Sequence, residues 1–134
     1  MNFIVTENGF DKNKVMLDGT RFFVGNGYMG CRGTLEEFTK SELVGITLAG
    51  VYDQVGDSWR EPVNAPNGLY TRLFVDGSEI NALAHEPKEH KMQLDLKRAA
   101  LTRESEYEDV TVRTTRFASA DDLHLLVLRY SITP

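Results

Sequence analysis

Three glycines in the segment GNGYMGCRG could bind phosphate, because Gly25, Gly27 and Gly30 form the G-x-G-x-x-G pattern of dinucleotide-binding loops. An apolar run precedes them, and Asp53 follows at about the expected spacing. Such a loop also requires a long helix directly after it, since the helix N-terminus holds the pyrophosphate. Here the capping-box pattern of Thr34–Glu37 is short and polar, and it predicts a single turn. We therefore interpret the glycines as residues that allow tight turns between packed strands.

The residues that most often bind metals or act as nucleophiles are few and scattered. His85 and His90 lie in a predicted polar loop, His124 opens a predicted strand, and none has the spacing of a metal site. Cys31 has no histidine close to it in the sequence and is interpreted as a small buried hydrophobe. The sequence predicts no metal site and no cofactor.

Carboxylate clusters are the remaining candidates for acid–base chemistry. Glu36–Glu37, Glu106–Asp109 and Asp121–Asp122 are all predicted to lie in solvated turns. Any two of these carboxylates could act as the acid and base of a glycosidase, but spacing alone selects no pair. No catalytic residue is therefore assigned.

Three aromatic residues near strand and loop ends are candidates for stacking on sugar rings. They are Tyr52, Trp59 and Tyr70. Aromatic side chains at such positions serve equally in cores and interfaces. A carbohydrate-binding role is thus one of two interpretations.

Composition excludes several classes of protein. The chain has 134 residues, a formal net charge of -5 and no run of Lys and Arg, which argues against a nucleic-acid surface. No apolar stretch approaches the roughly 20 residues needed to span a bilayer. Met1–Val5 lacks the features of a signal peptide. The single cysteine cannot form an internal disulfide and favours a reducing, cytoplasmic setting.

Hydrophobic periodicity is mostly two, which is typical of strands. Val110–Thr114 alternates cleanly, and 89–104 fits strands better than a helix in this context. Val44–Tyr52 also predicts a strand, with a bulge or close backbone approach at its glycines. The segment Gly56–Gly68, rich in proline and glycine, is predicted to be a loop.

Two further segments complete the expected sheets. Leu69–Val75 predicts a strand that enters a hairpin at Asp76 and Gly77, where a type I′ turn needs positive φ at both central residues. In the last strand, one large apolar face should meet the core: Leu126, Leu128, Tyr130 and Ile132. The expected fold class is all-β, an antiparallel β-sandwich. Because the chain stops as a strong strand finishes, we expect this sandwich to be incomplete.

Four sequence blocks follow one another along the chain: FFVGNGYMGCRGTLEE, LFVDGSEI, MQLDLKRAALTRE and TTRFASADDLHLLVLRYSITP. In this order they resemble the N-terminal region of glycoside hydrolase family 65, which includes maltose, kojibiose, nigerose and trehalose phosphorylases and some α-glucoside hydrolases. The sequence departs from the family at Lys97–Ala100, where a glycine is frequent, and at Cys31, where a small aliphatic residue is usual.

The resemblance implies an architecture in which this chain, residues 1–134, is the first half of a galactose-mutarotase-like super-sandwich. In the family a helical linker, an (α/α)6 barrel and a small β domain follow. The catalytic glutamate and the phosphate site belong to the barrel, so no catalytic residue carries over to this chain. The implied partner is the missing barrel, with disaccharide and inorganic phosphate as substrates of the parent enzyme only.

Eight residues of the first block are candidates for a structural or interdomain motif, with Arg32 expected to ion-pair or hydrogen-bond with Glu36 or Glu37. They are Asn26, Gly27, Tyr28, Gly30, Arg32, Gly33, Glu36 and Glu37. The implied function is a non-catalytic scaffold that also forms interdomain or dimer contacts, and the chain alone is expected to be inactive. The alternative is a free-standing carbohydrate-binding sandwich. We also expect a two-fold homodimer that buries the last strand or its sheet face.

Overall fold

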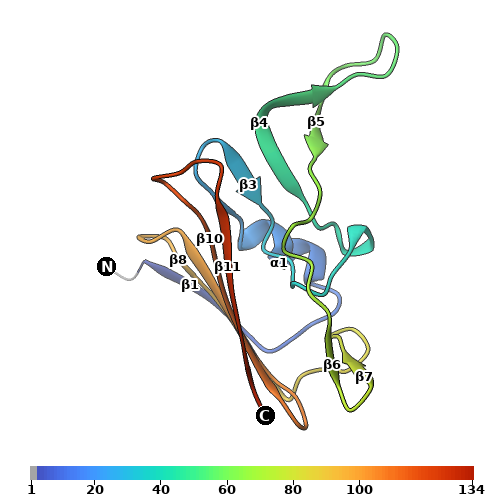
Figure 1. The fold of residues 1–134 in the computed structure, drawn as a ribbon, viewed down its shortest axis with the longest axis vertical. Coiled ribbons are helices and arrows are strands. Elements are labelled where there is room, and N and C mark those ends of the chain that lie inside the picture. The colour runs from blue at the N-terminus through green and yellow to red at the C-terminus, as the bar shows by residue number, and fades with distance from the viewer. Residues whose placement is uncertain (1–2) are drawn as a thin grey trace.

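A computed structural model describes residues 3–134. Met1 and Asn2, which belong to the segment Met1–Val5 that lacks signal-peptide features, lie outside the described residues. The protein is built almost entirely from antiparallel strands (Figure 1). The larger sheet contains, in spatial order, β1 (Ile4–Asn8), β8 (Glu89–Asp95), β9 (Ala100–Glu106), β10 (Thr111–Ala118) and β11 (Leu126–Thr133). The smaller sheet contains β2 (Val24–Gly25), β3 (Met29–Cys31), β4 (Ile46–Asp53) and β5 (Glu61–Asn64). A separate hairpin pairs β6 (Leu73–Val75) with β7 (Ser78–Ile80). The predicted all-β, antiparallel fold is confirmed.

The larger sheet follows the predicted period of two. In β9 the side chains of Leu101, Arg103 and Ser105 are buried, and in β10 those of Val112 and Arg116 are buried. Their neighbours in each strand are half-buried or exposed. The predicted strands at 89–104 and Val110–Thr114 are thus confirmed as β8, β9 and β10, and the inner face of the sheet carries two arginines.

Helical structure is limited to two short segments in the described residues 3–134, α1 (Val15–Arg21) and the 3-10 helix η1 (Lys40–Glu42). The sequence analysis missed α1, which has no side-chain cap at Lys14. The capping box occurs at Thr39, whose backbone N–H donates to Glu42 Oε2 at 2.8 Å, rather than at Thr34. The predicted single turn at Thr34–Glu37 exists, closed by the Phe38 N–H donating to Leu35 O at 3.1 Å.

Three expectations for the smaller elements need adjustment. The predicted loop Gly56–Gly68 contains β5, and the predicted strand Leu69–Val75 is a strand only in β6. The hairpin turn is confirmed, because Asp76 and Gly77 have φ of 48° and 81°. The register between β4 and β5 shifts between Thr47 and Tyr52, where Gly50 has φ of 81°, and this irregularity matches the predicted bulge.

Two apolar clusters form the core. The larger lies between the sheets and includes the fully buried Phe22, Phe38 and Leu101. The smaller joins Tyr107, Val110 and Val112 to the β6–β7 hairpin. In β11, which is an edge strand, Leu126 and Leu128 pack against the first cluster and Tyr130 against the second, whereas Ile132 is 49% exposed. The predicted core face is therefore wrong at Ile132.

The glycine segment forms the turn between β2 and β3. Gly25 pairs with Gly30, the Asn26 N–H donates to Met29 O at 3.1 Å, and Gly27 has φ of 89°. No helix follows the hairpin directly, since 32–39 is irregular apart from one turn. This arrangement excludes the dinucleotide-binding interpretation, which needs a helix N-terminus at the loop.

Two of these glycines are required by close packing. A Cβ on Gly30 would lie 2.1 Å from the Phe23 ring, and a Cβ on Gly33 would lie 2.5 Å from the backbone oxygen of Phe22. The backbone oxygen cannot rotate away as a side chain could. Gly33 therefore allows the chain to pass directly over Phe22, which is fully buried.

We predict that Gly33→Ala lowers the free energy of unfolding by about 1–3 kcal/mol, because the new methyl group overpacks a fixed backbone. The matched control is Gly68→Ala, where an added Cβ meets nothing within 4 Å and φ is not positive. It should leave stability unchanged or raise it by up to about 1 kcal/mol. Urea unfolding of the three proteins measures both effects, and equal stability of the two variants would contradict the packing argument.

Candidate functional site

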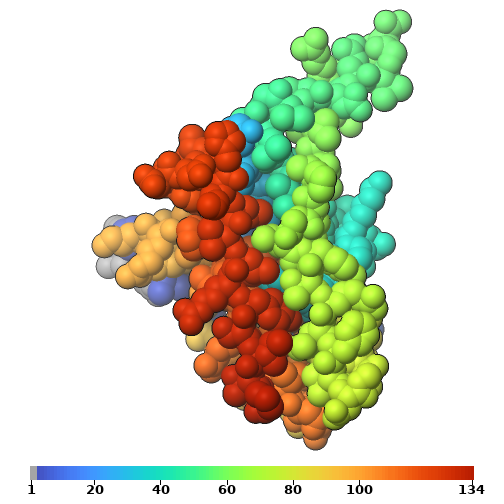
Figure 2. Space-filling model, viewed as in Figure 1, coloured from blue at the N-terminus to red at the C-terminus, as the bar shows by residue number. Residues whose placement is uncertain are grey.

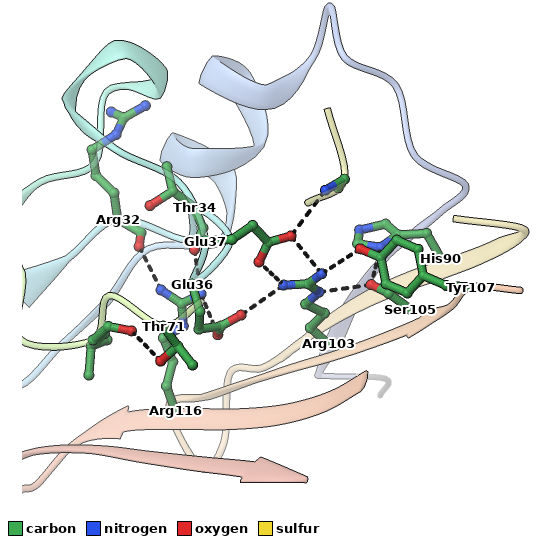
Figure 3. Close-up of polar contacts among 12 residues, drawn as sticks. Arg32, Thr34, Glu36, Glu37, Thr71, His90, Arg103, Ser105, Tyr107 and Arg116 are labelled. Atoms are coloured by element: carbon green, nitrogen blue, oxygen red, sulfur yellow. Dashed lines mark hydrogen bonds and ion pairs between the residues drawn. The ribbon is translucent and has the colours of Figure 1, made fainter. Parts of the chain in front are cut away.

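A buried ionic cluster joins the segment after the glycine hairpin to the larger sheet (Figure 3). Glu36 and Glu37 come from the turn at 35–38, which lies over the inner face of the sheet. Arg103 on β9 and Arg116 on β10 point up from that face. All four residues are at most 5% exposed. With two carboxylates and two guanidinium groups, the cluster is electrically balanced.

Arg103 and Arg116 share the two carboxylates between them. Arg103 binds Glu37 with two nitrogens, NH1 to Oε2 at 2.6 Å and NH2 to Oε1 at 2.9 Å. Its NH1 also donates to Glu36 Oε2 at 3.0 Å, and Arg116 NH2 donates to Glu36 Oε1 at 2.8 Å. Arg116 further donates to the backbone oxygens of Arg32 and Thr34. One cluster thus fixes the path of the chain from 32 to 37.

A polar chain extends from Arg103 to a buried histidine. Arg103 donates from Nε to Ser105 Oγ at 2.8 Å and from NH2 to the Tyr107 hydroxyl at 3.0 Å. Ser105 Oγ lies 2.8 Å from His90 Nδ1. Because Arg103 Nε can only donate, the Ser105 hydroxyl hydrogen is available to Nδ1, which fits a neutral imidazole. The structure places His90 in β8 and buried, so the predicted polar loop is wrong there.

The charges in the cluster set its protonation states. Burial opposes ionisation of Glu36, but the positive charges of Arg116 and Arg103 outweigh it and hold the pKa of Glu36 below its ordinary value. Burial likewise disfavours the Arg103 cation, yet the Glu37 carboxylate raises the Arg103 pKa. Burial and then the charge of Arg103 lower the pKa of His90 to about 4. At neutral pH Glu36 is therefore ionised, Arg103 is charged and His90 carries no charge.

This arrangement serves structure rather than catalysis. A general acid must be protonated near the working pH, whereas the lowered pKa of Glu36 keeps it ionised. Both oxygens of Glu36 and of Glu37 already accept hydrogen bonds within the chain. With less than a tenth of either residue exposed, no substrate reaches them. The cluster therefore fixes one chain segment to the sheet.

The predicted solvated positions of the acidic residues were right for some and wrong for others. Glu106, Glu108 and the pair Asp121–Asp122 are exposed. Glu36 and Glu37 are buried because Arg103 and Arg116 lie beneath them and compensate for lost hydration. One signal in the sequence could have revealed this burial. Arg103 and Arg116 both occupy positions that point inward in the alternating pattern of their strands.

The remaining residues of the candidate motif hold other parts of the segment. Asn26 Oδ1 accepts from the N–H groups of Tyr28 and Met29, and its Nδ2 donates to Ser119 O at 2.6 Å. The Tyr28 ring lies 4.6 Å from the ring of His124. The glycine hairpin is therefore tied to the loop between β10 and β11.

The expected contact of Arg32 with Glu36 or Glu37 is absent from the described structure. Arg32 NH2 instead donates to the Met16 backbone oxygen at 2.7 Å, while Arg103 and Arg116 occupy the carboxylates. Cys31 is buried as predicted, and burial raises the pKa of its thiol. Within residues 3–134, no group of three or more His, Cys, Asp and Glu side chains could hold a metal ion.

The three candidate sugar-stacking residues do not form one platform. Tyr52 lines a groove over the glycine hairpin, Tyr70 lines a different groove beside Lys40, and Trp59 lines neither. All three side chains are exposed. No helix in the described part of the chain is long and apolar enough to cross a membrane.

Fold and site together define an all-β domain whose main polar feature is structural. A family model described as "Glycosyl hydrolase family 65, N-terminal domain" matches residues 5–134. The chain belongs to that family, in agreement with the resemblance carried by the four sequence blocks.

Several curated relatives are phosphorylases much longer than this chain. The chain is 47% identical to a nigerose phosphorylase of Lachnoclostridium phytofermentans, over 99% of this chain and 18% of the relative. It is 38% identical to a kojibiose phosphorylase of Thermoanaerobacter brockii, over 86% of this chain and 16% of the relative. A solved structure, "Putative kojibiose phosphorylase from human microbiome", has the same fold, with a TM-score of 0.82 at 19% identity over 97% of this chain and 19% of that chain. The chain thus spans less than a fifth of the length of these relatives.

We predict that Arg103→Met destabilises the fold by about 3–5 kcal/mol, because it leaves Glu37 buried with only the Ala82 N–H donating to it. The matched control is Arg113→Met on the neighbouring strand, which breaks an exposed 2.9 Å pair with Glu104. That variant should be about as stable as the wild type, because exposed ion pairs contribute little. Thermal or urea unfolding measures the difference, and similar losses in both variants would refute the structural role of the cluster.

A second prediction concerns pH. The unfolded chain protonates a histidine near its ordinary value of 6.5, whereas folded His90 resists protonation down to about 4. The contribution of neutral His90 to the free energy of unfolding is therefore fully present above pH 6.5. As the pH drops to about 4, about 3 kcal/mol of it is lost. Glu36, whose pKa is lowered, adds a further loss only below about 4.5.

His90→Gln should remove most of the stability change between pH 6.5 and 4.5, because the variant has no proton to bind at this position. His85→Gln is the control, since His85 is exposed and should keep the wild-type slope. Urea unfolding at a series of pH values gives the slopes. A wild-type slope in His90→Gln would show that another group is responsible.

Proposed function

We propose that this chain is the N-terminal, non-catalytic portion of an inverting α-glucoside phosphorylase or hydrolase that acts on disaccharides in carbohydrate metabolism. The observation that carries the non-catalytic role is the buried Arg103–Glu37–Glu36–Arg116 cluster. Its four charged side chains bind one another and are buried, so none of them is available to a substrate. The relatives, nigerose and kojibiose phosphorylases, support the class of parent enzyme.

The domain would act as a scaffold on which the catalytic part of the parent rests. Its core is held by a cluster that opposes sliding of the 32–38 segment, since each carboxylate binds a guanidinium group on a fixed strand. The glycine hairpin presents a firm edge, because Asn26 ties it to the β10–β11 loop. Such rigidity suits a domain that positions another domain. The same proposal includes contacts of this domain with the other domains and with a second copy of the parent enzyme. It also includes a disaccharide and inorganic phosphate as substrates of the parent, and a cytoplasmic setting.

The test has two arms, both read as release of glucose 1-phosphate from nigerose or kojibiose with inorganic phosphate. The isolated chain should release none. A chimera in which this chain replaces the matching segment of the Lachnoclostridium nigerose phosphorylase should phosphorolyse nigerose. The same chimera with Arg103→Met should lose thermal stability and active protein, whereas Arg113→Met should not.

Activity of the isolated chain would overturn the proposal, and so would a folded but inactive chimera. The competing function, a free-standing carbohydrate-binding domain, predicts that the isolated chain binds nigerose, kojibiose or maltose in calorimetric titrations. The scaffold function predicts no heat of binding. Tyr52→Ala and Tyr70→Ala would locate any sugar site that is found.

A further inference from the structure

Three Asn-Gly pairs occur in the chain, and in such a pair the asparagine side chain can react with the backbone of the next residue. They are Asn8–Gly9, Asn26–Gly27 and Asn67–Gly68. The backbone nitrogen of the glycine attacks the side-chain carbon Cγ, and glycine favours this attack because it has no Cβ to obstruct it. Since the reacting groups are the same in all three pairs, the fold decides which pair reacts.

The reaction needs no reagent except water. A bond forms between the glycine nitrogen and Cγ, the bond from Cγ to Nδ2 breaks, and the proton of the glycine N–H leaves with the side-chain nitrogen as ammonia. Water then opens the succinimide ring at either of its carbonyl groups. One product is aspartate, and the other is isoaspartate, whose backbone is longer by a methylene group. The reaction therefore requires a free glycine N–H, a movable side chain and a nitrogen that is free to leave.

The first pair is protected at the attacking nitrogen. The Gly9 N–H donates to the backbone oxygen of His90 at 2.7 Å. This hydrogen bond continues the ladder between β1 and β8, in which Asn8 pairs with Lys91. Attack by the Gly9 nitrogen would break the hydrogen bond and release the end of β1 from the sheet. The fold therefore keeps Asn8 from reacting.

The second pair is protected at the side chain. Asn26 Oδ1 accepts from the N–H groups of Tyr28 at 3.0 Å and Met29 at 2.9 Å. Its Nδ2 donates to the backbone oxygens of Ser119 at 2.6 Å and Leu123 at 3.0 Å. These four hydrogen bonds fix the side chain, and the nitrogen that would leave is bound to two acceptors. The contact between the glycine hairpin and the β10–β11 loop thus keeps Asn26 from reacting.

The third pair has neither protection. It lies between β5 and β6, in a segment that runs over the surface of the molecule in green to yellow-green (Figure 2). Gly68 is exposed, and an added Cβ there would meet nothing within 4 Å. Within residues 3–134, neither the Gly68 N–H nor Asn67 Nδ2 donates a hydrogen bond. The nucleophile and the leaving nitrogen are therefore both free.

The one hydrogen bond of the Asn67 side chain assists the attack. Asn67 Oδ1 accepts from the Leu69 N–H at 3.1 Å. This contact turns the side chain back over the intervening Gly68 peptide, as in an Asx turn. It also stabilises the negative charge that develops on Oδ1 as the Gly68 nitrogen bonds to Cγ. We propose that Asn67 is the deamidation site of this chain, through a succinimide formed with Gly68, and that the fold protects Asn8 and Asn26.

The modification acts on the packing next to the segment. Leu69 is buried in the larger apolar cluster, and the Thr71 N–H donates to the backbone oxygen of Glu36 at 3.0 Å. A methylene group inserted at position 67 displaces these contacts, because the buried Leu69 is only two residues away. Aspartate keeps the original backbone and an oxygen for the Leu69 N–H. Isoaspartate, but not aspartate, therefore loosens the segment 67–71 from the turn at 35–38.

Incubation of the 134-residue chain in mildly alkaline buffer, followed by proteolysis and tandem mass spectrometry, gives a deamidation rate for each asparagine. In the folded chain Asn67 should react at least about tenfold faster than Asn26, because four hydrogen bonds must break at Asn26 and one at Asn67. Asn8 should also react more slowly than Asn67. In urea above the unfolding transition, the three rates should become similar. Gly68→Ala, which has space for its methyl group, should slow the reaction at Asn67 and leave the other two rates unchanged.

A folded chain in which Asn8 or Asn26 reacts as fast as Asn67 would overturn the assignment. An unchanged rate at Asn67 in Gly68→Ala would overturn the succinimide route. For the structural effect, aged wild type should unfold at a lower urea concentration than fresh wild type, whereas fresh Asn67→Asp and aged Gly68→Ala should not differ from fresh wild type. An unchanged midpoint in aged protein shown to contain isoaspartate at position 67 would overturn the loosening of the segment.

Discussion

The bidentate contact between Arg103 and Glu37 is the interaction on which the rest of this domain depends. It lies between the larger sheet and the turn at 35–38, and Glu36 continues it to Arg116, so a turn after the glycine hairpin is fastened to two adjacent strands. Buried charges are unfavourable unless they are paired, so the cluster tolerates few alternative arrangements. The sheet, the turn and the Phe22 core must all be in register before the four charges can meet.

Glycine and arginine have complementary parts in this packing. Gly33 lets the chain pass over Phe22, and Gly30 makes room for the ring of Phe23. That close approach brings the chain on either side of Gly33 to Arg116, which donates hydrogen bonds to the backbone oxygens of Arg32 and Thr34. A motif that resembles a phosphate loop in sequence is therefore a packing motif in three dimensions.

The interior and the surface of the domain differ in the groups that they leave without a partner. The four buried charged side chains bind one another, and His90 is neutral beside them. At the surface, by contrast, Trp59 and Tyr70 are exposed large apolar side chains. In the scaffold role proposed above, the paired interior would hold the shape of the domain, and its exposed apolar side chains would be left for contacts with the rest of the parent enzyme.

The sequence by itself determined the strands and several turns, since these depend on local alternation and on residues such as Asp76 and Gly77 that accept positive φ. It also determined the family, because four ordered blocks match it. Only the tertiary structure decided the state of Glu36 and Glu37, which look like a solvated pair until Arg103 and Arg116 are placed beneath them. Those arginines lie more than sixty residues away in the chain. Burial of a charge is a long-range property, set by which partner the fold supplies, and local pattern carries no record of that partner.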